Sequence, residues 1–233
     1  MNLHSHLRCV NLLPVTTLRP NAPKQERSRH TMHRLLSAAE ALLEHGGIEA
    51  ATVPAIAEAA GVSVGVIYRR FPNKDALLRA VYERFFTTTA EQNVVRLQSV
   101  NACDAMKVPL PLLARGIVKG LVEGYRRRRG LLRALTRYAR THPDPSFRRS
   151  AQRMNRATIG ALVILLESYR DQIRHPDPET AIEFALFTIA STLQNVLIED
   201  ERFIALRVPE NLEEELVRML FGYLGISESS RSR

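Results

Sequence analysis

Hydrophobic residues recur with a helical period along almost the whole chain from residue 26 onward. No stretch shows the sustained apolar–polar alternation that a half-buried strand requires. The first helix is expected over 26–45, where Leu35, Leu36 and Ala39 share one side and a Gly-Gly pair follows. The pattern predicts an all-α protein.

Two short helices come next. Thr52 is a suitable N-cap for a helix over 53–60, which Gly61 ends. Ser63 is placed to cap a second helix over 64–70, which ends where a residue precedes proline. Longer helices then follow, with breaks at glycine or at Asp-Pro steps, and we expect them over 74–97, 110–128, 130–142, 144–173, 178–200 and 211–225.

The joint between the two short helices has the chemistry of a helix-turn-helix. Helices that cross steeply through a short turn need small residues at the crossing, which Ala57 and Gly61 supply. The second helix of such a pair can enter the DNA major groove with its N-terminal residues at the base edges. The small core beneath it is expected to hold Ile56, Val62, Ile67 and Phe71.

The exposed residues of this unit suit contact with DNA. Small residues at the start of the second helix allow close approach to bases, and the hydroxyls and cations around it can bind phosphates. Backbone N–H groups at the start of the next helix can also hold phosphate, and Asp75 is favourable near its positive end. The predicted DNA-binding residues are Thr52, Ser63, Val64, Gly65, Val66, Tyr68, Arg69, Arg70 and Lys74.

This region resembles the DNA-binding signature of the TetR family of bacterial transcriptional regulators. The resemblance rests on Ile56-Ala57-Glu58-Ala59-Ala60-Gly61-Val62-Ser63, then Tyr68-Arg69-Arg70-Phe71, then Lys74-Asp75-Ala76-Leu77. It covers about 24–84. It implies a homodimer that binds a double-stranded DNA operator with inverted half-sites, represses nearby genes and is released by a small ligand.

Length and composition fit this organisation. The 233 residues (26.3 kDa, 45% hydrophobic) suffice for one large domain or two small ones. We expect a flexible extension over 1–23, a three-helix DNA-binding domain over 24–84, a larger helical ligand-binding and dimerisation domain over 85–226, and a flexible tail over 227–233. Within the extension, Arg8, Arg19 and the following Lys24 are candidates for a basic arm on DNA phosphates.

Composition also excludes several classes. Two cysteines exclude a disulfide scaffold and a Cys-rich zinc module. His30 and His33 share a helix face without a third ligand nearby, so no metal is expected. No signal-peptide plan and no spanning apolar run is apparent, which predicts a cytoplasmic protein without membrane contact. Phosphate-loop and hydrolase motifs are missing, so we expect neither an enzyme nor a cofactor, although a helical enzyme with a DNA-binding appendage is a remote alternative.

Charge is concentrated in the middle of the chain. The net charge is 33 − 24 = +9, and residues 115–156 alone carry +11. Helical spacing places Arg133, Arg137 and Arg140 opposite the apolar side of their helix, and the arginines of the next helix likewise. A solvated face is one interpretation; control by a protein partner through this arginine-rich face is another. Ligand-dependent activation is a further alternative to repression.

Two surfaces of the regulatory domain are expected from composition and spacing. The apolar walls and hydroxyls of a pocket for an apolar or amphipathic effector would come from Leu121, Tyr125, Met154, Thr158, Phe184, Phe187, Thr188 and Ser191. The helix over 178–200 is apolar nearly all round and would pair with the helix over 211–225 in a four-helix bundle between two copies. The expected interface residues are Ile189, Leu193, Val196, Leu216, Leu220 and Tyr223.

Overall fold

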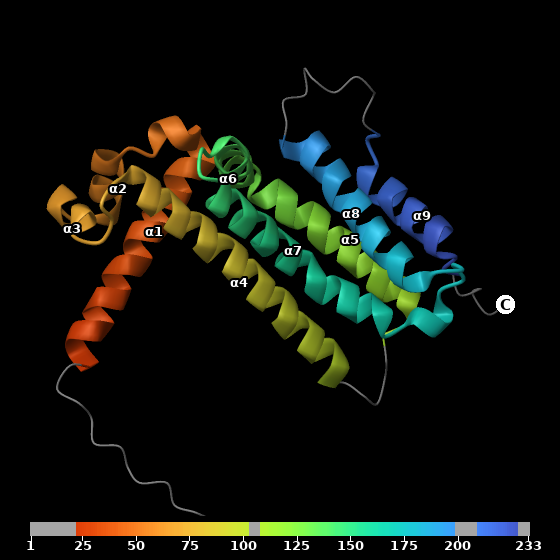
Figure 1. Cartoon of the computed structure of the whole chain (residues 1–233). Coiled ribbons are helices and arrows are strands. Elements are labelled where there is room, and N and C mark those ends of the chain that lie inside the picture. Colours follow the sequence, from red (N-terminus) through yellow and green to blue (C-terminus); the bar gives the residue numbers. More distant parts are fainter. Residues whose placement is uncertain (1–21, 103–107, 199–208, 228–233) are drawn as a thin grey trace, which may run out of the picture.

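The computed structural model describes residues 22–102, 108–198 and 209–227, and it contains helices and no strand within these ranges (Figure 1). Short 3₁₀ and π segments follow two of the helices, at Arg170–Gln172 and Gln194–Ile198. The α-helices are α1 (Ala22–Ala50), α2 (Val53–Ala60), α3 (Val64–Tyr68), α4 (Lys74–Ala102), α5 (Leu110–Arg127), α6 (Arg129–Thr141), α7 (Pro145–Glu167), α8 (Pro178–Leu193) and α9 (Leu212–Leu224).

The predicted all-α class is confirmed, and most boundaries agree within three residues. Four helices differ. α1 continues to Ala50 across a break at Gly47, where φ is 67° and ψ is −162°. α4 runs five residues further than expected. α7 stops at Glu167, after which the chain tightens into the 3₁₀ turn. α8 ends at Leu193 instead of the expected residue 200, and a π segment continues the chain to Ile198.

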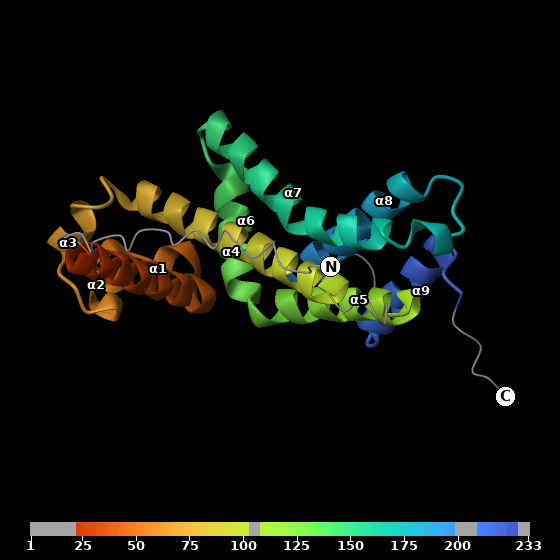
Figure 2. The same cartoon turned by 90° about the horizontal axis from the view of Figure 1, so that it is seen from below.

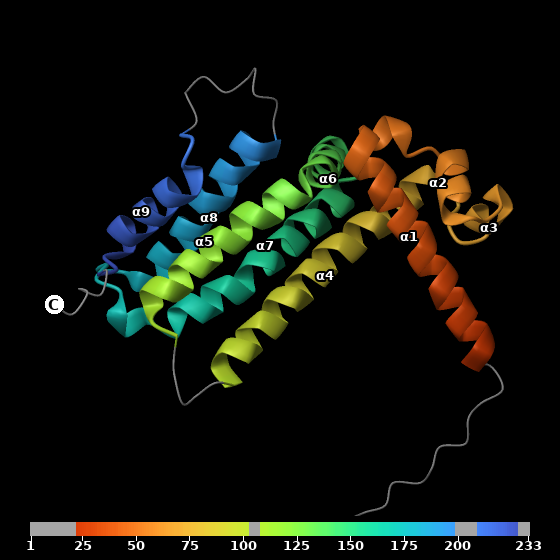
Figure 3. The same cartoon turned by 180° about the vertical axis from the view of Figure 1, so that it is seen from behind.

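Buried side chains form two hydrophobic cores. The first joins α1, α2, α3 and the first half of α4 to α6 and the start of α7. The second joins α5, α8 and α9 to the rest of α7. α4 and α7 lie side by side and run from the end of the molecule that carries α3 toward the opposite end (Figures 1 and 3).

The first core extends past the predicted boundary at residue 84. Leu131 and Leu135 of α6 and Phe147 of α7 are buried against α1 and α4. The view from below shows α6 crossing behind α4 at this junction (Figure 2). The first four helices therefore share their core with α6 and the start of α7, which gives a direct mechanical connection between the two parts of the chain.

Several sequence-based expectations fall on residues that the structure does not describe. They include nearly all of the extension over 1–23 and the tail over 227–233, with Arg8, Arg19 and both cysteines. α8 and the π segment together (Pro178–Ile198) have the length and mean hydropathy, 1.5, that a membrane span would need. Core helices meet the same criterion, and Ala181, Ile182 and Leu186 of α8 are buried in the second core.

Candidate DNA-binding surface

The turn between α2 and α3 depends on a glycine in the left-handed conformation. Gly61 has φ 61° and ψ 44°, and its N–H donates to the carbonyl of Glu58 at 2.9 Å. The N–H of Val62 donates to the carbonyl of Ala57, also at 2.9 Å. A Cβ at Gly61 would lie 2.6 Å from Nη2 of Arg34, so both backbone conformation and space favour glycine here.

Arg34 of α1 holds this turn from outside. Its guanidinium donates to the carbonyl oxygen of Ala60, and Nη2 lies 3.4 Å from that of Gly61. These carbonyls end α2 and have no partner within the helix, so a cation is favourable there. Sequence reasoning missed Arg34, because an arginine on an exposed helix position gives no signal that its carbonyl partners lie 26 residues ahead.

We call the unit of α2, α3 and the turn between them the reader. The small core predicted beneath it is confirmed for three of its four members. Ile56, Ile67 and Phe71 are buried, and Val62 is half-buried. These contacts fix the crossing of α2 and α3, so the start of α3 is presented as a rigid element.

The N-terminal residues of α3 are mostly exposed. Ser63, Val64 and Gly65 are exposed, and Val66 is half-buried. Ser63 stands at the N-cap position of α3, but its side chain makes no capping hydrogen bond, contrary to the sequence-based expectation. Its hydroxyl is therefore available to an external partner.

Larger polar residues flank this start. Tyr68 is 53% exposed, and Arg69 is exposed beside it. Thr52 accepts a hydrogen bond from the N–H of Ala55 at 3.3 Å, so its predicted capping role is confirmed and its own hydroxyl hydrogen stays free. Arg70 is half-buried, and its Nη2 donates to Oγ of Ser28 on α1 at 3.2 Å.

Lys74 has a structural partner that the sequence did not indicate. Its ammonium donates to the carbonyl of Ile48 at 2.8 Å and so joins the start of α4 to the end of α1. Beside it, Oδ1 of Asn73 accepts from the N–H of Ala76 at 2.8 Å and caps α4. A phosphate contact by Lys74 stays a prediction.

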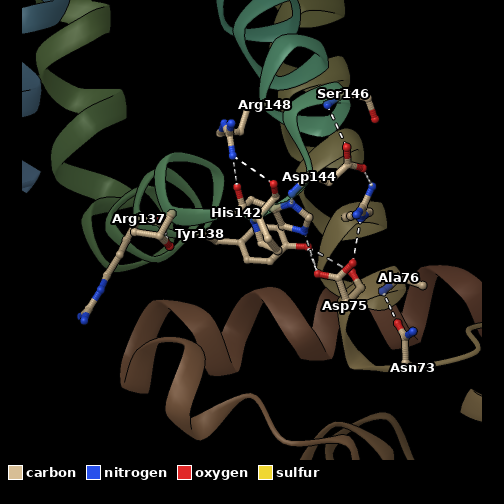
Figure 4. A network of polar contacts seen from close by, with 12 residues as sticks. Asn73, Asp75, Ala76, Arg137, Tyr138, His142, Asp144, Ser146 and Arg148 are labelled. Atoms are coloured by element: carbon tan, nitrogen blue, oxygen red, sulfur yellow. Dashed lines mark hydrogen bonds and ion pairs between the residues drawn. The ribbon is translucent and has the colours of Figure 1, made fainter.

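A polar network directly behind the reader joins α4 to the loop between α6 and α7 (Figure 4). Oδ1 of Asp75 accepts from the hydroxyl of Tyr138 at 2.7 Å and pairs with Nε2 of His142 at 2.9 Å. Arg79 bridges Oδ2 of Asp75 at 2.8 Å and Oδ2 of Asp144 at 3.0 Å. The N–H of Asp144 donates to Nδ1 of His142 at 3.1 Å, so Nε2 carries the proton toward Asp75.

The network shifts the ionisation of its members. Burial works against the charged form of Asp75, but hydrogen bonds from Tyr138, His142 and Arg79 together hold the pKa of its carboxyl below the usual value. Hydrogen bonds from Ser146, followed by Arg79, lower the pKa of Asp144. Both carboxylates are therefore charged at neutral pH, and they bind the loop between α6 and α7 to the start of α4.

The predicted effector residues do not converge on one cavity. Leu121 and Tyr125 pack half-buried against the second core, and burial raises the pKa of the Tyr125 hydroxyl. Phe184 and Phe187 are 53% and 63% exposed on the outside of α8, and they are not among the residues that line the cavity between α4 and α7. The remaining three hydroxyl-bearing residues are half-buried on two helices: Thr158, Thr188 and Ser191.

A cavity lies between α4 and α7, and Met154 is the one predicted effector residue on its wall. Its volume is about 430 Å³, and Glu91 is the one charged residue on its wall. Its walls are otherwise almost entirely apolar and are formed by Phe86, Thr87, Ala90, Glu91, Val94, Val95, Met154 and Ala157.

The predicted interface residues are mostly internal. Ile189, Leu193, Leu216 and Leu220 are buried in the second core of the same chain, so they are unavailable to a partner. Val196 is half-buried against that core.

An exposed aromatic patch occupies the outside of α8 and α9 instead. It consists of Phe184, Phe187 and Tyr223, and the rings of Phe184 and Tyr223 lie 5.6 Å apart. Of the predicted interface residues, Tyr223 is the one in this patch, and it is 38% exposed.

The arginines of the middle segment lie on the surface as predicted. Arg133, Arg137 and Arg140 of α6 and the arginines at 149, 153 and 156 of α7 are exposed. Nε of Arg133 donates to the carbonyl of Ile198, so this arginine joins α6 to the end of the α8 segment. In the part of the chain that the structure describes, no group of three or more histidine, cysteine or acidic side chains could hold a metal ion.

Fold and site together define a helix-turn-helix regulator of bacterial type. The profile of the tetR family of bacterial regulatory proteins matches residues 35–81. The profile of the tetracycline repressor-like C-terminal domain matches residues 109–224. The chain therefore belongs to the TetR family, whose members regulate transcription and are not enzymes.

Individual relatives agree with this assignment. The transcriptional repressor KstR of Rhodococcus jostii is 44% identical over 69 residues, which is 30% of this chain and 30% of that protein. A transcriptional regulator from Rhodococcus sp. RHA1 has a similar fold, with a TM-score of 0.57 and 22% identity over 83% of this chain and 95% of its own. The fatty acid degradation regulator FadR of Bacillus halodurans gives a TM-score of 0.60 and 17% identity over 87% of this chain and 97% of its own.

The extent of these matches limits what they show. The chain spans about a third of the length of the curated KstR proteins it matches. The structural neighbours share under 25% identity, so they show the fold.

Proposed function

We propose that this protein is a homodimeric transcriptional repressor that binds an inverted-repeat DNA operator through α3. The observation that supports this most is the exposed start of α3. Ser63, Val64 and Gly65 stand free on a turn that Gly61 and Arg34 fix in place. A rigid helix start with small side chains can approach base edges closely, while Tyr68 and Arg69 reach phosphates.

The dimer is proposed to form through the aromatic patch on α8 and α9. Three large aromatic side chains left exposed on one face are unfavourable in water, and a two-fold contact would bury them against their own copies. Two readers held in this way would meet successive major grooves about 34–36 Å apart on one side of the DNA.

Release is proposed to follow binding of an apolar or amphipathic molecule in the cavity between α4 and α7. This cavity lies on the helix that begins directly behind α3, and its walls are almost wholly apolar. A ligand that separates α4 from α7 would change the spacing of the two readers. To act as a switch it must bind the two conformations with different affinity, about 1–3 kcal/mol apart. A cytoplasmic location, where the operator is accessible, belongs to the same proposal.

Selection of bound DNA from a random pool, at a stated salt concentration, tests the function. We expect enrichment of an inverted repeat whose half-sites are one helical turn apart. On that DNA, Tyr68→Ala should weaken binding about 10-fold or more, because a hydrogen bond to a charged group such as a phosphate contributes about 1.5–3 kcal/mol. Dimerisation, measured by sedimentation, should not change.

Two results would contradict the proposal. Failure to enrich any sequence would argue against a sequence-reading repressor. Operator binding by the Tyr68→Ala protein at wild-type strength would show that α3 is not the reader. The sign of regulation is measured with a reporter gene behind the selected operator, where repression requires lower expression in the presence of the protein.

A further inference from the structure

The first half of α1 extends beyond the cores. All six residues from Gln25 to His30 are exposed, and the first residues buried in the core are Leu35 and Leu36. Residues 22–34 extend about 20 Å at the rise of an α-helix. The start of α1 and α3 both lie at the end of the molecule opposite α9 (Figures 1 and 3).

This projecting segment is basic and has few partners of its own. Arg27 and Arg29 are exposed, and neither makes an ion pair with the residues that the structure describes. Glu26 is the one acidic residue between positions 22 and 34. Both guanidinium groups are therefore available to an external anion.

The segment is oriented by contacts to the reader. Nη2 of Arg70, just after α3, donates to Oγ of Ser28 at 3.2 Å. Arg27 lies seven residues, or two turns, before Arg34, so the two share one side of α1. Arg34 is the residue whose guanidinium meets the carbonyls at the turn between α2 and α3. The side of α1 that carries Arg27 therefore faces the same way as the helix-turn-helix.

We propose that the first half of α1 is a second DNA-binding element, in which Arg27 contacts a phosphate next to the major groove that α3 occupies. Ser28 is a positioning residue that directs Arg70 to a neighbouring phosphate. The proposal rests on the proposed function and extends it to residues 22–34, which precede the part matched by the family profile.

A phosphate is the group that this geometry fits best. Among the side chains that the structure describes, Arg27 is a single exposed cation on an open helix surface, without the paired donors that bidentate base recognition requires. A single guanidinium in that setting attracts the closest fixed negative charge. Beside a recognition helix in its groove, that charge is the DNA backbone.

The salt dependence of operator binding tests the proposal directly. Each phosphate contact contributes about 0.9 to the slope of log K against log salt. Arg27→Ala should therefore lower the steepness by about 0.9. The ratio of wild-type to Arg27→Ala operator affinity should therefore fall about threefold to fourfold between 50 and 200 mM salt, because the salt concentration rises fourfold and 4 raised to the power 0.9 is about 3.5. The ratio of specific to non-specific affinity should stay constant, because a phosphate contact does not read sequence.

Matched variants separate this contact from general charge and from folding. Arg156→Ala removes the same charge from an exposed position on α7 and should leave the slope unchanged. Arg27→Lys should keep the slope, because it keeps the charge. Hydroxyl-radical footprinting should show that Arg27→Ala loses a protected backbone position while the α3 contacts remain.

Ser28 gives an independent readout. Ser28→Ala should weaken operator binding without changing the slope, because Arg70 keeps its charge but loses its hydrogen bond. Ser28→Thr retains a hydroxyl and should restore the affinity. In an Arg70→Ala background, Ser28→Ala should have no further effect; an additive effect would contradict the positioning role.

The outcomes distinguish the two proposals. An unchanged slope for Arg27→Ala, or an equal change for Arg156→Ala, would overturn the α1 contact. Binding of an acidic protein that Arg27→Ala abolishes, with the DNA slope intact, would also overturn it. If the wild type selects no operator but Arg27→Ala still lowers the slope on random DNA, the α1 contact stands and the sequence-specific function fails.

Discussion

The reader and the second core differ in how closely the local sequence determines which side chains face inward. α2 and α3 span eight and five residues; Thr52 caps the start of α2, and Gly61 ends it and turns the chain toward α3. In α2 and α3 the expected core residues, Ile56 and Ile67, are buried. In α8 the two phenylalanines expected to line a pocket, Phe184 and Phe187, are exposed, and two residues expected at an interface, Ile189 and Leu193, are buried.

The cause is the distribution of apolar residues around each helix. A helix with one apolar side has one favourable orientation, so its sequence predicts its faces. α8 is apolar on several sides, and burying any of them yields a similar hydrophobic gain. Its orientation is decided by α5, α7 and α9, which are distant in sequence. The apolar composition therefore predicted the helix correctly, but it did not predict which side of the helix is buried within the protomer and which is exposed.

Phe187→Glu, which tests whether the exposed face of α8 is the dimer interface, should have the largest effect. Phe187 is 63% exposed in the protomer, so the fold should tolerate a charge there. At a two-fold contact the charge would be buried next to its own copy, which is strongly unfavourable. We expect the dimer dissociation constant to rise at least 30-fold, about 2 kcal/mol, by analytical ultracentrifugation. Operator binding should fall with it.

The contrasting variant is Leu193→Glu. Leu193 is buried within the protomer, so an unpaired charge there should unfold the second core rather than separate two folded chains. Circular dichroism distinguishes the two outcomes. A folded, monomeric Leu193→Glu protein together with a dimeric Phe187→Glu protein would restore the interface expected from the sequence.

Gly61→Ala tests the reader at the residue where local sequence matters most. A non-glycine residue in this left-handed conformation costs about 1–3 kcal/mol, and the new Cβ would displace Arg34 from the carbonyls it holds. We expect a loss of this size in urea unfolding at fixed protomer concentration. Gly120→Ala is the control, because nothing lies within 4 Å of a Cβ at that position of α5. It should not be destabilising, since alanine is the better helix former.

The polar network that joins the two regions could not be predicted from the sequence. Asp75 was placed correctly at the start of a helix, where its charge is favourable. Its partners Tyr138 and His142 lie more than 60 residues away, and only the packing of α6 and α7 against α4 brings them together. Tyr138 resembled an ordinary core residue, and His142 a residue at a helix break. Caps and turns can be predicted because they depend on residues that are close in the sequence. A network that joins three distant elements depends on how those elements pack.

Asp75→Asn should weaken the contact between α4 and the loop that joins α6 to α7, and so lower the free energy of unfolding. The pKa of Asp75 and that of Asp144 are lower in the folded protein than in the unfolded chain. Their stabilisation is therefore complete above the unfolded value of about 3.9 and is lost as the pH falls through the lower folded values. We expect Asp75→Asn to cost about 1–2 kcal/mol at pH 7, a modest amount because the side chain is partly exposed.

The pH dependence provides the check. The difference between wild type and Asp75→Asn in urea unfolding should be constant between pH 7 and 5 and should shrink below about pH 4. Asp171→Asn is the control, because Asp171 is 97% exposed and its pair with Arg170 is 3.8 Å long. A difference that grows in acid would contradict the assignment of Asp75 as a charged hydrogen-bond acceptor.

Thr52→Ala is the smallest change and the finest test of local specification. Oγ1 of Thr52 accepts from the N–H of Ala55, so its loss should destabilise by about 0.5–1 kcal/mol. The hydroxyl hydrogen is free to donate to a phosphate, which adds about 1 kcal/mol, or roughly fivefold, to operator affinity. Thr52→Ser should restore both properties. Asp177→Ala removes a comparable cap from α8, where Oδ1 accepts from the N–H of Thr180, and should reduce stability alone. If Thr52→Ala lowers stability but leaves operator affinity at the wild-type value, as Asp177→Ala should, Thr52 is a cap only, and DNA contact at the reader narrows to α3 and its flanking cations.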